Sequence, residues 1–451
     1  MSEKSKKQKV SIVEKMGLFM VCAGNIPLMG LLSGFFMIYY TNVVGLEPAA
    51  LATLFLISKV VDGISDPIMG YFLDKFPVTK MGKFRPMIIL GTIICVINYI
   101  LLWFGAVWIP VGKYVIVYVT YLLLGWTFDI MDISKNSLLP VMSADDKERN
   151  SLSLFNALGT MIGSAVLAVA APILVAEGTL QNYYVLIFGS MAMVLVLSIA
   201  GALCVKERVA FEGKKEESYT FRELLQFLRY KPVWALFLVA LVVGVGSNIA
   251  GGAGAYFYTY ILGDMTLMSG VSLVSMITAL VGIFLGPILA NRFGKKQIFV
   301  MAIVVSILFS ALRLIDVRSM LLIYISTVAG GGVAGGCIAP LTTSIQADNT
   351  TYVQYKTGKR AEAAIASLTS FITKVAQGLG GAIPGYVLAA TGFVTGSVAQ
   401  PESINTGIIL CVLILPTILT AAGAILFGTQ YTLDKKAVEE MHTAIAARSN
   451  K

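Results

Sequence analysis

The stretch Lys59-Val60-Val61-Asp62-Gly63-Ile64-Ser65-Asp66-Pro67 places two carboxylates inside the long apolar run 47–71. A run of this length can cross a bilayer as a helix, and an ionised side chain at its centre costs roughly 2.5–3.5 kcal/mol or more. Residues at i and i+4 share one face of a helix, so Asp62 and Asp66 lie on one stripe, with Lys59 one turn before them. The pattern predicts an ion or proton site within the membrane.

The composition supports a membrane class. Hydrophobic residues make up 57% of the 451 residues and charged residues only 13%, with a mean hydropathy of +0.81, which is far from the balance of a soluble domain. We expect an all-α integral membrane protein with twelve transmembrane helices, because each apolar run is near or above the ~20 residues that span a bilayer. The runs are 17–41, 47–71, 86–109, 114–140, 153–176, 183–205, 233–262, 267–289, 298–315, 321–345, 364–391 and 405–428.

The basic residues predict the orientation. Of 34 lysines and arginines, 28 fall on one side of these twelve runs, and only Lys113, Arg313 and Arg318 fall on the other. Such a bias predicts that both termini are cytoplasmic, in a multi-pass protein of the bacterial inner membrane. The net charge of +9 then reflects topology and contact with anionic lipid, so we expect no nucleic-acid partner.

Three short matches indicate an internal duplication. Tyr40–Gly45 resembles Tyr258–Gly263, Gly82-Lys83 matches Gly294-Lys295, and the stretch beginning Ser151-Leu152 matches that beginning Ser367-Leu368, at separations of 212 to 218 residues. Ordered matches at nearly one spacing predict two repeated halves. We therefore expect a six-helix half at 1–205, a cytoplasmic linker at 206–232, a second six-helix half at 233–428 and a cytoplasmic tail at 429–451.

The module Asp66-Pro67-Ile68-Met69-Gly70, followed by Gly82-Lys83-Phe84-Arg85-Pro86, resembles the glycoside–pentoside–hexuronide:cation symporter family of the major facilitator superfamily. The resemblance extends over both halves, through Met131-Asp132-Ile133, Ser247-Asn248-Ile249 and Lys374. It implies a major-facilitator fold that imports sugars or glycosides with a cation by alternating access. It also implies a gate at the cytoplasmic helix ends formed by Asp74, Lys83 and Arg85.

The resemblance further assigns Asp62 and Asp66 as principal cation ligands, Asp132 as the link to the substrate and Lys374 as a counter-charge from the second half. Asp62, Asp132 and Lys374 lie eight to ten residues from the cytoplasmic ends of their runs. At 1.5 Å per residue this places all three ~12–15 Å deep, where they can form one polar cluster. A structural ion pair between Lys59 and the two acids is the competing interpretation, and Lys374 as a tether between helices is another.

Departures from the family pattern concern the substrate. Asn25 stands where sugar transporters of the family have an acid, Lys135-Asn136 replaces proline and aromatic residues, and Asn156 replaces an arginine. Lys135 can engage an anionic substrate or can neutralise Asp129 and Asp132, so a sugar, glycoside or hexuronide competes with a non-sugar organic anion. The candidate substrate-binding residues are Asp132, Lys135, Asn136, Lys374, Asn25 and Asn248.

The coupling ion stays open between H⁺ and Na⁺. Ser65 is a weak metal ligand, and Asp129 adds a carboxylate able to carry a proton, yet Asp62 and Asp66 offer the hard oxygen ligands that a sodium ion requires. The candidate cation-binding residues are Asp62, Asp66, Asp129, Asp132 and Ser65. Apart from this ion we expect no cofactor, and the expected partners are the solute, the cation and the lipid bilayer, with the chain acting as a monomer.

An enzyme is one alternative class. Intramembrane prenyltransferases also carry Asp-x-x-x-Asp pairs, but they need a second acidic cluster, and Asp264, Asp316 and Asp348 each stand alone at loops. A receptor that kept the transporter fold is the other alternative. The retention of the acids of the family and of Lys374 argues against it. The sequence therefore predicts a transporter and no catalytic residues.

Overall fold

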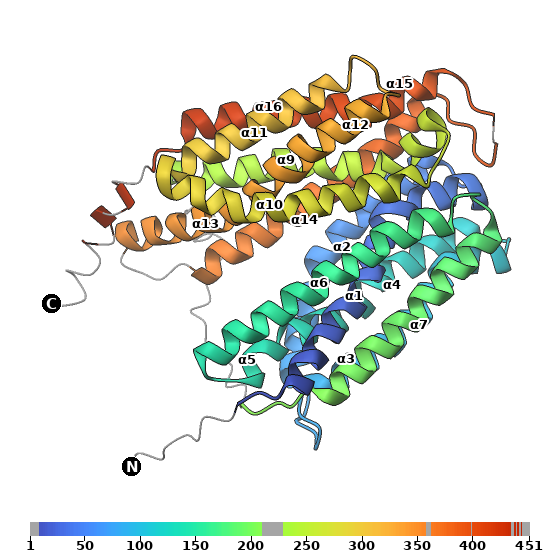
Figure 1. Cartoon of the computed structure of the whole chain (residues 1–451). Helices are drawn as coiled ribbons and strands as arrows, with labels where there is room; N and C mark the ends of the chain where they lie inside the picture. Colours follow the sequence, from blue (N-terminus) through green and yellow to red (C-terminus); the bar gives the residue numbers. More distant parts are fainter. Residues whose placement is uncertain are drawn as a thin grey trace, which may run out of the picture. The chain divides into compact units, whose positions relative to one another are not determined.

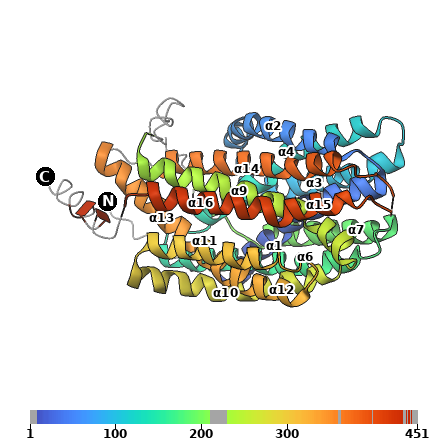
Figure 2. The ribbon, with the colours of Figure 1, turned by 90° about the horizontal axis from the view of Figure 1, so that it is seen from above.

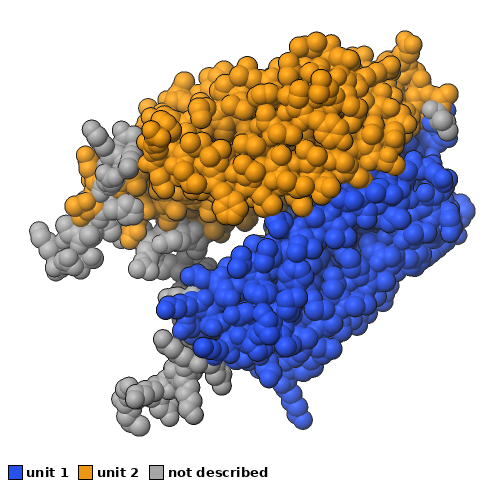
Figure 3. Space-filling model, in the orientation of Figure 1, with its two compact units in different colours: residues 1–47, 56–214, 395–398 blue, residues 48–55, 215–394, 399–451 orange. Residues whose placement is uncertain are grey.

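The computed structural model describes residues 9–209, 229–357, 362–397, 399–433 and a few positions between 437 and 443. In this part of the chain the regular elements are helices, with a single β-bridge between Thr79 and Gly82 (Figure 1). The chain divides into two compact units, one of residues 1–47, 56–214 and 395–398, the other of residues 48–55, 215–394 and 399–451 (Figure 3). The predicted boundaries of the halves stay a prediction, and most of the predicted linker lies outside the described residues.

The elements of the first part of the chain are α1 (Ile12–Tyr39), η1 (Tyr40–Val44), α2 (Pro48–Lys75), α3 (Phe84–Trp108), α4 (Lys113–Asn136), α5 (Leu138–Met142), α6 (Asp146–Leu174) and α7 (Leu180–Cys204). Those of the second part are α9 (Lys231–Tyr256), η2 (Phe257–Leu262), α10 (Leu267–Phe293), α11 (Lys295–Leu312), α12 (Met320–Ser326), η3 (Thr327–Ala334), α13 (Gly335–Thr357), α14 (Glu362–Ala390), α15 (Ser403–Ile409), η4 (Leu410–Ile414) and α16 (Leu415–Gln430).

Among the described residues, ten stretches of helix are long and apolar enough to cross a membrane. The all-α membrane class is thereby confirmed. Helices α2 and α14 have 28 and 29 residues but are not among the ten, so the count of twelve spans stays a prediction.

The two units share one packing arrangement. Helix α1 packs against α6 and α7, and helix α9 packs in the same way against α14 and α16, between which it lies (Figure 2). Within each unit the first helix is thus central, and it contacts the fourth and fifth long helices that follow it. A central helix in each unit is positioned to present polar side chains to its neighbours.

The two central helices also end in the same backbone geometry. After η1, the amide groups of Gly45 and Leu46 both donate to the Tyr40 carbonyl, and Gly45 has a φ of 79°. After η2, the amides of Gly263 and Asp264 donate to the Tyr258 carbonyl, and Gly263 has a φ of 76°. A positive φ favours glycine, which explains why glycine is the last residue of each of the two matched sequences.

Close backbone contact holds α1 against α6. Pro27 has no amide hydrogen, so it leaves the carbonyl of Ala23 without its usual helical bond. Gly163 of α6 faces this carbonyl, and a Cβ on Gly163 would lie 2.9 Å from the Ala23 oxygen. The corresponding contact in the second unit is at Gly380 of α14, where a Cβ would lie 2.6 Å from the Val245 carbonyl oxygen. Small residues permit this approach, as is usual between helices in lipid.

We expect Gly163→Ala to lower the thermal unfolding temperature of the detergent-purified protein, because the added methyl group must push α6 away from α1 at a cost of about 1–3 kcal/mol. The matched control is Gly34→Ala in α1, where a Cβ meets nothing within 4 Å. That change should be neutral or stabilising by about 0.5–1 kcal/mol, since alanine favours a helix over glycine. Equal unfolding temperatures for the two variants would contradict this account of the contact.

Candidate functional site

Asp62 lies at the contact between α2 and α4. Its Oδ2 accepts a hydrogen bond of 2.7 Å from the Lys59 ammonium, one turn earlier on the same helix. Its Oδ1 lies over Gly125 of α4, where a Cβ would be only 2.6 Å away. Gly125 therefore leaves the space that the carboxylate occupies, a role that the sequence analysis missed because nothing local to α4 marks it.

Asp129 lies one helical turn beyond Gly125, on the same side of α4. The hydroxyl of Ser65, which is fully buried, lies 3.2 Å from the Asp62 carbonyl oxygen and 3.5 Å from the Asp129 Oδ2. No lysine or arginine nitrogen in the described part of the chain lies within 4.0 Å of the Asp129 carboxylate. Among the side chains that the structure describes, Asp129 is thus a half-buried acid held by one long hydrogen bond.

Asp132 has the most complete set of partners. Its Oδ1 accepts hydrogen bonds from the Lys135 ammonium at 2.7 Å and from the Asn25 amide of α1 at 2.9 Å. Its Oδ2 accepts one at 2.9 Å from Asn136. Asn25 is only 4% exposed, so this partly buried bond links α1 and α4. The pairing of Lys135 with Asp132 is the neutralising contact that the sequence analysis weighed against a role in substrate binding.

The structure therefore brings seven of the predicted binding residues, together with Lys59, into two adjoining clusters along α4. One contains Lys59, Asp62, Ser65 and Asp129, and the other contains Asn25, Asp132, Lys135 and Asn136. Helix α2 includes Asp66 and Asp74, but their side chains lie outside the described part of the structure. Their predicted roles as a cation ligand and a gate residue stay predictions.

Two candidates belong to the second unit. Asn248 of α9 donates a hydrogen bond of 2.8 Å to the Gly244 carbonyl of its own helix and packs beside Gly380 of α14. Lys374 lies half-buried on α14, about two turns before Gly380. Their assignment to the substrate site stays a prediction.

The predicted gate residue Arg85 joins two helix ends within the first unit. Its Nε and Nη2 donate to the carbonyls of Ala202 and Leu203, in the last turn of α7, at 2.8 and 2.9 Å. The Glu207 carboxylate in turn accepts from the backbone amides of Lys83, Phe84 and Arg85 at 2.8 to 2.9 Å. Acids favour the start of a helix because of its exposed N–H groups. Sequence analysis missed Glu207, which lies more than 120 residues from its partners.

Comparison with known proteins identifies the family of this chain. The model of the family described as MFS/sugar transport protein matches residues 20–435. The chain belongs to this family. The resemblance that the motifs indicated is thereby confirmed, and the protein is a multi-pass membrane transporter of small molecules and not an enzyme.

Similar proteins include the putative glycoside/cation symporter YagG of Escherichia coli (strain K12), at 27% identity over 89% of this chain and 87% of that protein. The isoprimeverose transporter of Lactiplantibacillus pentosus is 27% identical over 83% of this chain and 79% of its own. The glucuronide carrier protein homolog of Escherichia coli (strain K12) is 26% identical over 82% of each chain. The same fold occurs in a bacterial homologue of the iron transporter ferroportin, with a TM-score of 0.67 at 13% identity, covering 94% of this chain and all of that one.

Proposed function

We propose that the protein is a cation-coupled secondary symporter that imports a sugar, glycoside or hexuronide-like solute by alternating access. The charge of Asp129 carries this proposal. Lys59 balances Asp62 and Lys135 balances Asp132, which leaves Asp129 as a carboxylate without a basic partner among the described side chains. An unbalanced acid within a membrane helix is costly, and a bound proton or sodium ion removes that cost.

The position of Asp129 suits a coupling role. It belongs to the Asp62 cluster through its bond to Ser65 of α2, and it lies only three residues from Asp132 on α4. A cation that binds there changes the charge beside the Asp132 cluster, which the family resemblance links to the substrate. Binding of the cation and binding of the solute then each favour the other, as symport requires.

The charge of the site favours a neutral or nearly neutral solute. With one cation bound at Asp129, the described acids and lysines of the two clusters sum to zero, so a sugar that offers hydroxyl groups to Asn25, Asp132 and Asn136 leaves the charge balanced. The similarity to YagG and the isoprimeverose transporter supports this substrate class. Hydroxyl groups can donate and accept, which suits the mixed amide and carboxylate groups.

A non-sugar organic anion is the second candidate, and the Lys135 ammonium favours it. This group has three donor hydrogens, and only one bond to Asp132 is present. An anion can use the remaining donors. The similarity to the glucuronide carrier protein homolog instead supports the hexuronide-like solute of the first proposal, which combines sugar hydroxyls and a carboxylate.

The proposal includes the setting of the protein. The basic residues gathered on one side of the apolar runs favour cytoplasmic termini in a bacterial inner membrane. Coupling at Asp129 needs H⁺ or Na⁺ and no prosthetic group. All the residues of the two clusters come from one chain, so we propose that a monomer is sufficient.

An uptake screen in proteoliposomes tests the function. It compares neutral glycosides, hexuronides and small organic acids, each with a sodium gradient, a proton gradient or no gradient. We expect a sugar-type solute to accumulate above its equilibrium level with one of the two gradients only. Accumulation of small organic acids alone would favour the second candidate. The absence of gradient-driven accumulation of any solute would contradict symport.

We expect Asp129→Asn to abolish gradient-driven accumulation while exchange of labelled for unlabelled solute continues, because the amide keeps the shape of the site but no longer needs a cation. The matched control is Asp316→Asn, which removes the same charge from an exposed loop. Uptake and exchange are measured on the same proteoliposome preparations. Wild-type accumulation by Asp129→Asn would remove Asp129 from the coupling site.

We expect Lys135→Gln to lower the transport of all accepted solutes by a similar factor, because it leaves Asp132 without its basic partner. Lys135→Arg should restore most of the activity, and Lys147→Gln, at an exposed lysine, should have no effect. The measurement is the Km and maximal rate for a neutral and an anionic solute. A selective rise of about 10- to 150-fold in the Km of the anion would show instead that Lys135 binds the substrate.

A further inference from the structure

A cavity of about 540 Å³ lies in the first unit, at the helix ends where α3 begins and α7 has just ended. None of its lining residues belongs to the clusters on α4. They are Lys80, Met81, Gly82, Arg85, Lys206, Glu207 and Arg208. Four of the seven are basic and one is acidic, so the cavity carries a positive excess that the transport site does not explain.

The one acid of the cavity is already engaged. The Glu207 carboxylate accepts three backbone hydrogen bonds from the first residues of α3, so it compensates the exposed N–H groups of that helix. Arg85 is engaged as well, because its guanidinium satisfies the carbonyls at the end of α7. The N–H groups at the start of α3 are thus satisfied by the chain itself. The positive charge of the cavity that is not compensated belongs to its three other basic residues.

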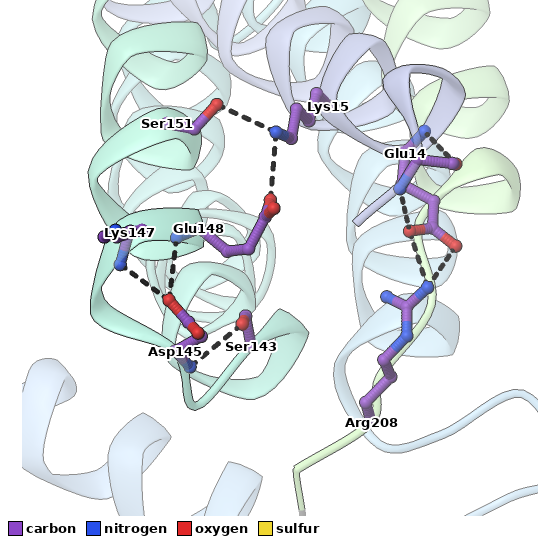
Figure 4. A network of polar contacts seen from close by, with 9 residues as sticks. Glu14, Lys15, Ser143, Asp145, Lys147, Glu148, Ser151 and Arg208 are labelled. Carbon is purple, nitrogen blue, oxygen red and sulfur yellow. Dashed lines mark hydrogen bonds and ion pairs between the residues drawn. The ribbon is translucent and has the colours of Figure 1, made fainter. Parts of the chain in front are cut away.

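Three basic groups keep binding capacity. Arg208 donates from Nη2 to both oxygens of Glu14 at 2.7 Å (Figure 4), whereas its Nη1 is buried and has no hydrogen-bond partner among the described residues. Lys80 and Lys206 are exposed, and neither forms an ion pair within the described part of the chain. A buried guanidinium nitrogen without a partner is costly, and its cost disappears when an anion accepts its hydrogen.

We propose that this cavity binds a phosphate group, as a phosphate ester or as inorganic phosphate. On binding, the Arg208 side chain turns so that Nη1, which is otherwise buried, donates a charge-assisted hydrogen bond to a phosphate oxygen, and the ammonium groups of Lys80 and Lys206 neutralise the remaining charge. Two sources offer this chemistry, namely the headgroup of an anionic phospholipid and a soluble phosphate compound. The bound group would contact Lys80, which precedes α3, and Lys206 and Arg208, which follow α7. It therefore fastens the chain that leaves α7 to the start of α3. This site is independent of the proposed transport function.

Binding to the purified full-length protein in neutral detergent tests the proposal. The soluble probe is inorganic phosphate, with chloride at equal ionic strength as its reference, and the lipid probe is phosphatidylglycerol, with phosphatidylcholine as its reference. We expect Lys80→Ala/Lys206→Ala to weaken binding roughly 25-fold, because each lysine near an anionic group contributes about a fivefold gain in affinity. Arg208→Lys, which keeps the charge beside Glu14 but lacks Nη1, should weaken binding about tenfold.

The matched control is Lys75→Ala/Lys147→Ala, which removes the same charge from outside the cavity. Lys75 lies over the Tyr71 ring of its own helix, and Lys147 is exposed at the start of α6 (Figure 4). Binding of phosphatidylglycerol alone, lost only in the cavity variants, identifies a lipid headgroup; binding of inorganic phosphate with the same pattern identifies a soluble ligand. The proposal is overturned if neither probe binds wild type better than its reference, or if the control weakens binding as much as the cavity variants do.

Discussion

The cost of a charge in an apolar surrounding is the constraint on which the polar interior of this protein depends. Helix α4 places Asp129 and Asp132 one turn apart, and Asp62 of α2 lies against the same helix at Gly125. Two of these acids are balanced by lysines three residues away on their own helices. Such local pairs need no particular arrangement of the remaining helices, so Asp62 and Asp132 are balanced whichever way the neighbouring helices pack.

Under the proposed function, Asp129, the acid left over, is the group through which the site responds to a cation. Asp129 is contacted by a neutral hydroxyl and not by a fixed cation, so its charge can be balanced by an ion that arrives and leaves. A lysine in the position of Ser65 would instead balance the charge of Asp129 permanently. The difference between a structural acid and a coupling acid in this unit is therefore whether the chain supplies the counter-charge itself.

Rigid packing complements these charges. The central helix of each unit meets its neighbour at glycines, where backbone atoms touch, as at Gly163 beside Ala23 and Gly380 beside Val245. At the helix ends, Arg85 and Glu207 satisfy backbone groups of α7 and α3 that lipid and water would otherwise contact. Both devices hold helices of one unit together through the backbone, which leaves the side chains of α4 available for binding.

The sequence by itself determined the membrane class, the family and the stripes of acids on α2 and α4, because hydropathy and the helical period are local properties. It also revealed the repeated ends at Gly45 and Gly263, since a positive φ needs glycine wherever it occurs. Only the tertiary structure decided that Asn25 binds Asp132, that Gly125 makes room for Asp62 and that Glu207 caps α3. These contacts join residues about 60 to 120 positions apart, and no periodicity predicts them. They depend on which helices pack together and on where a small side chain lets them approach.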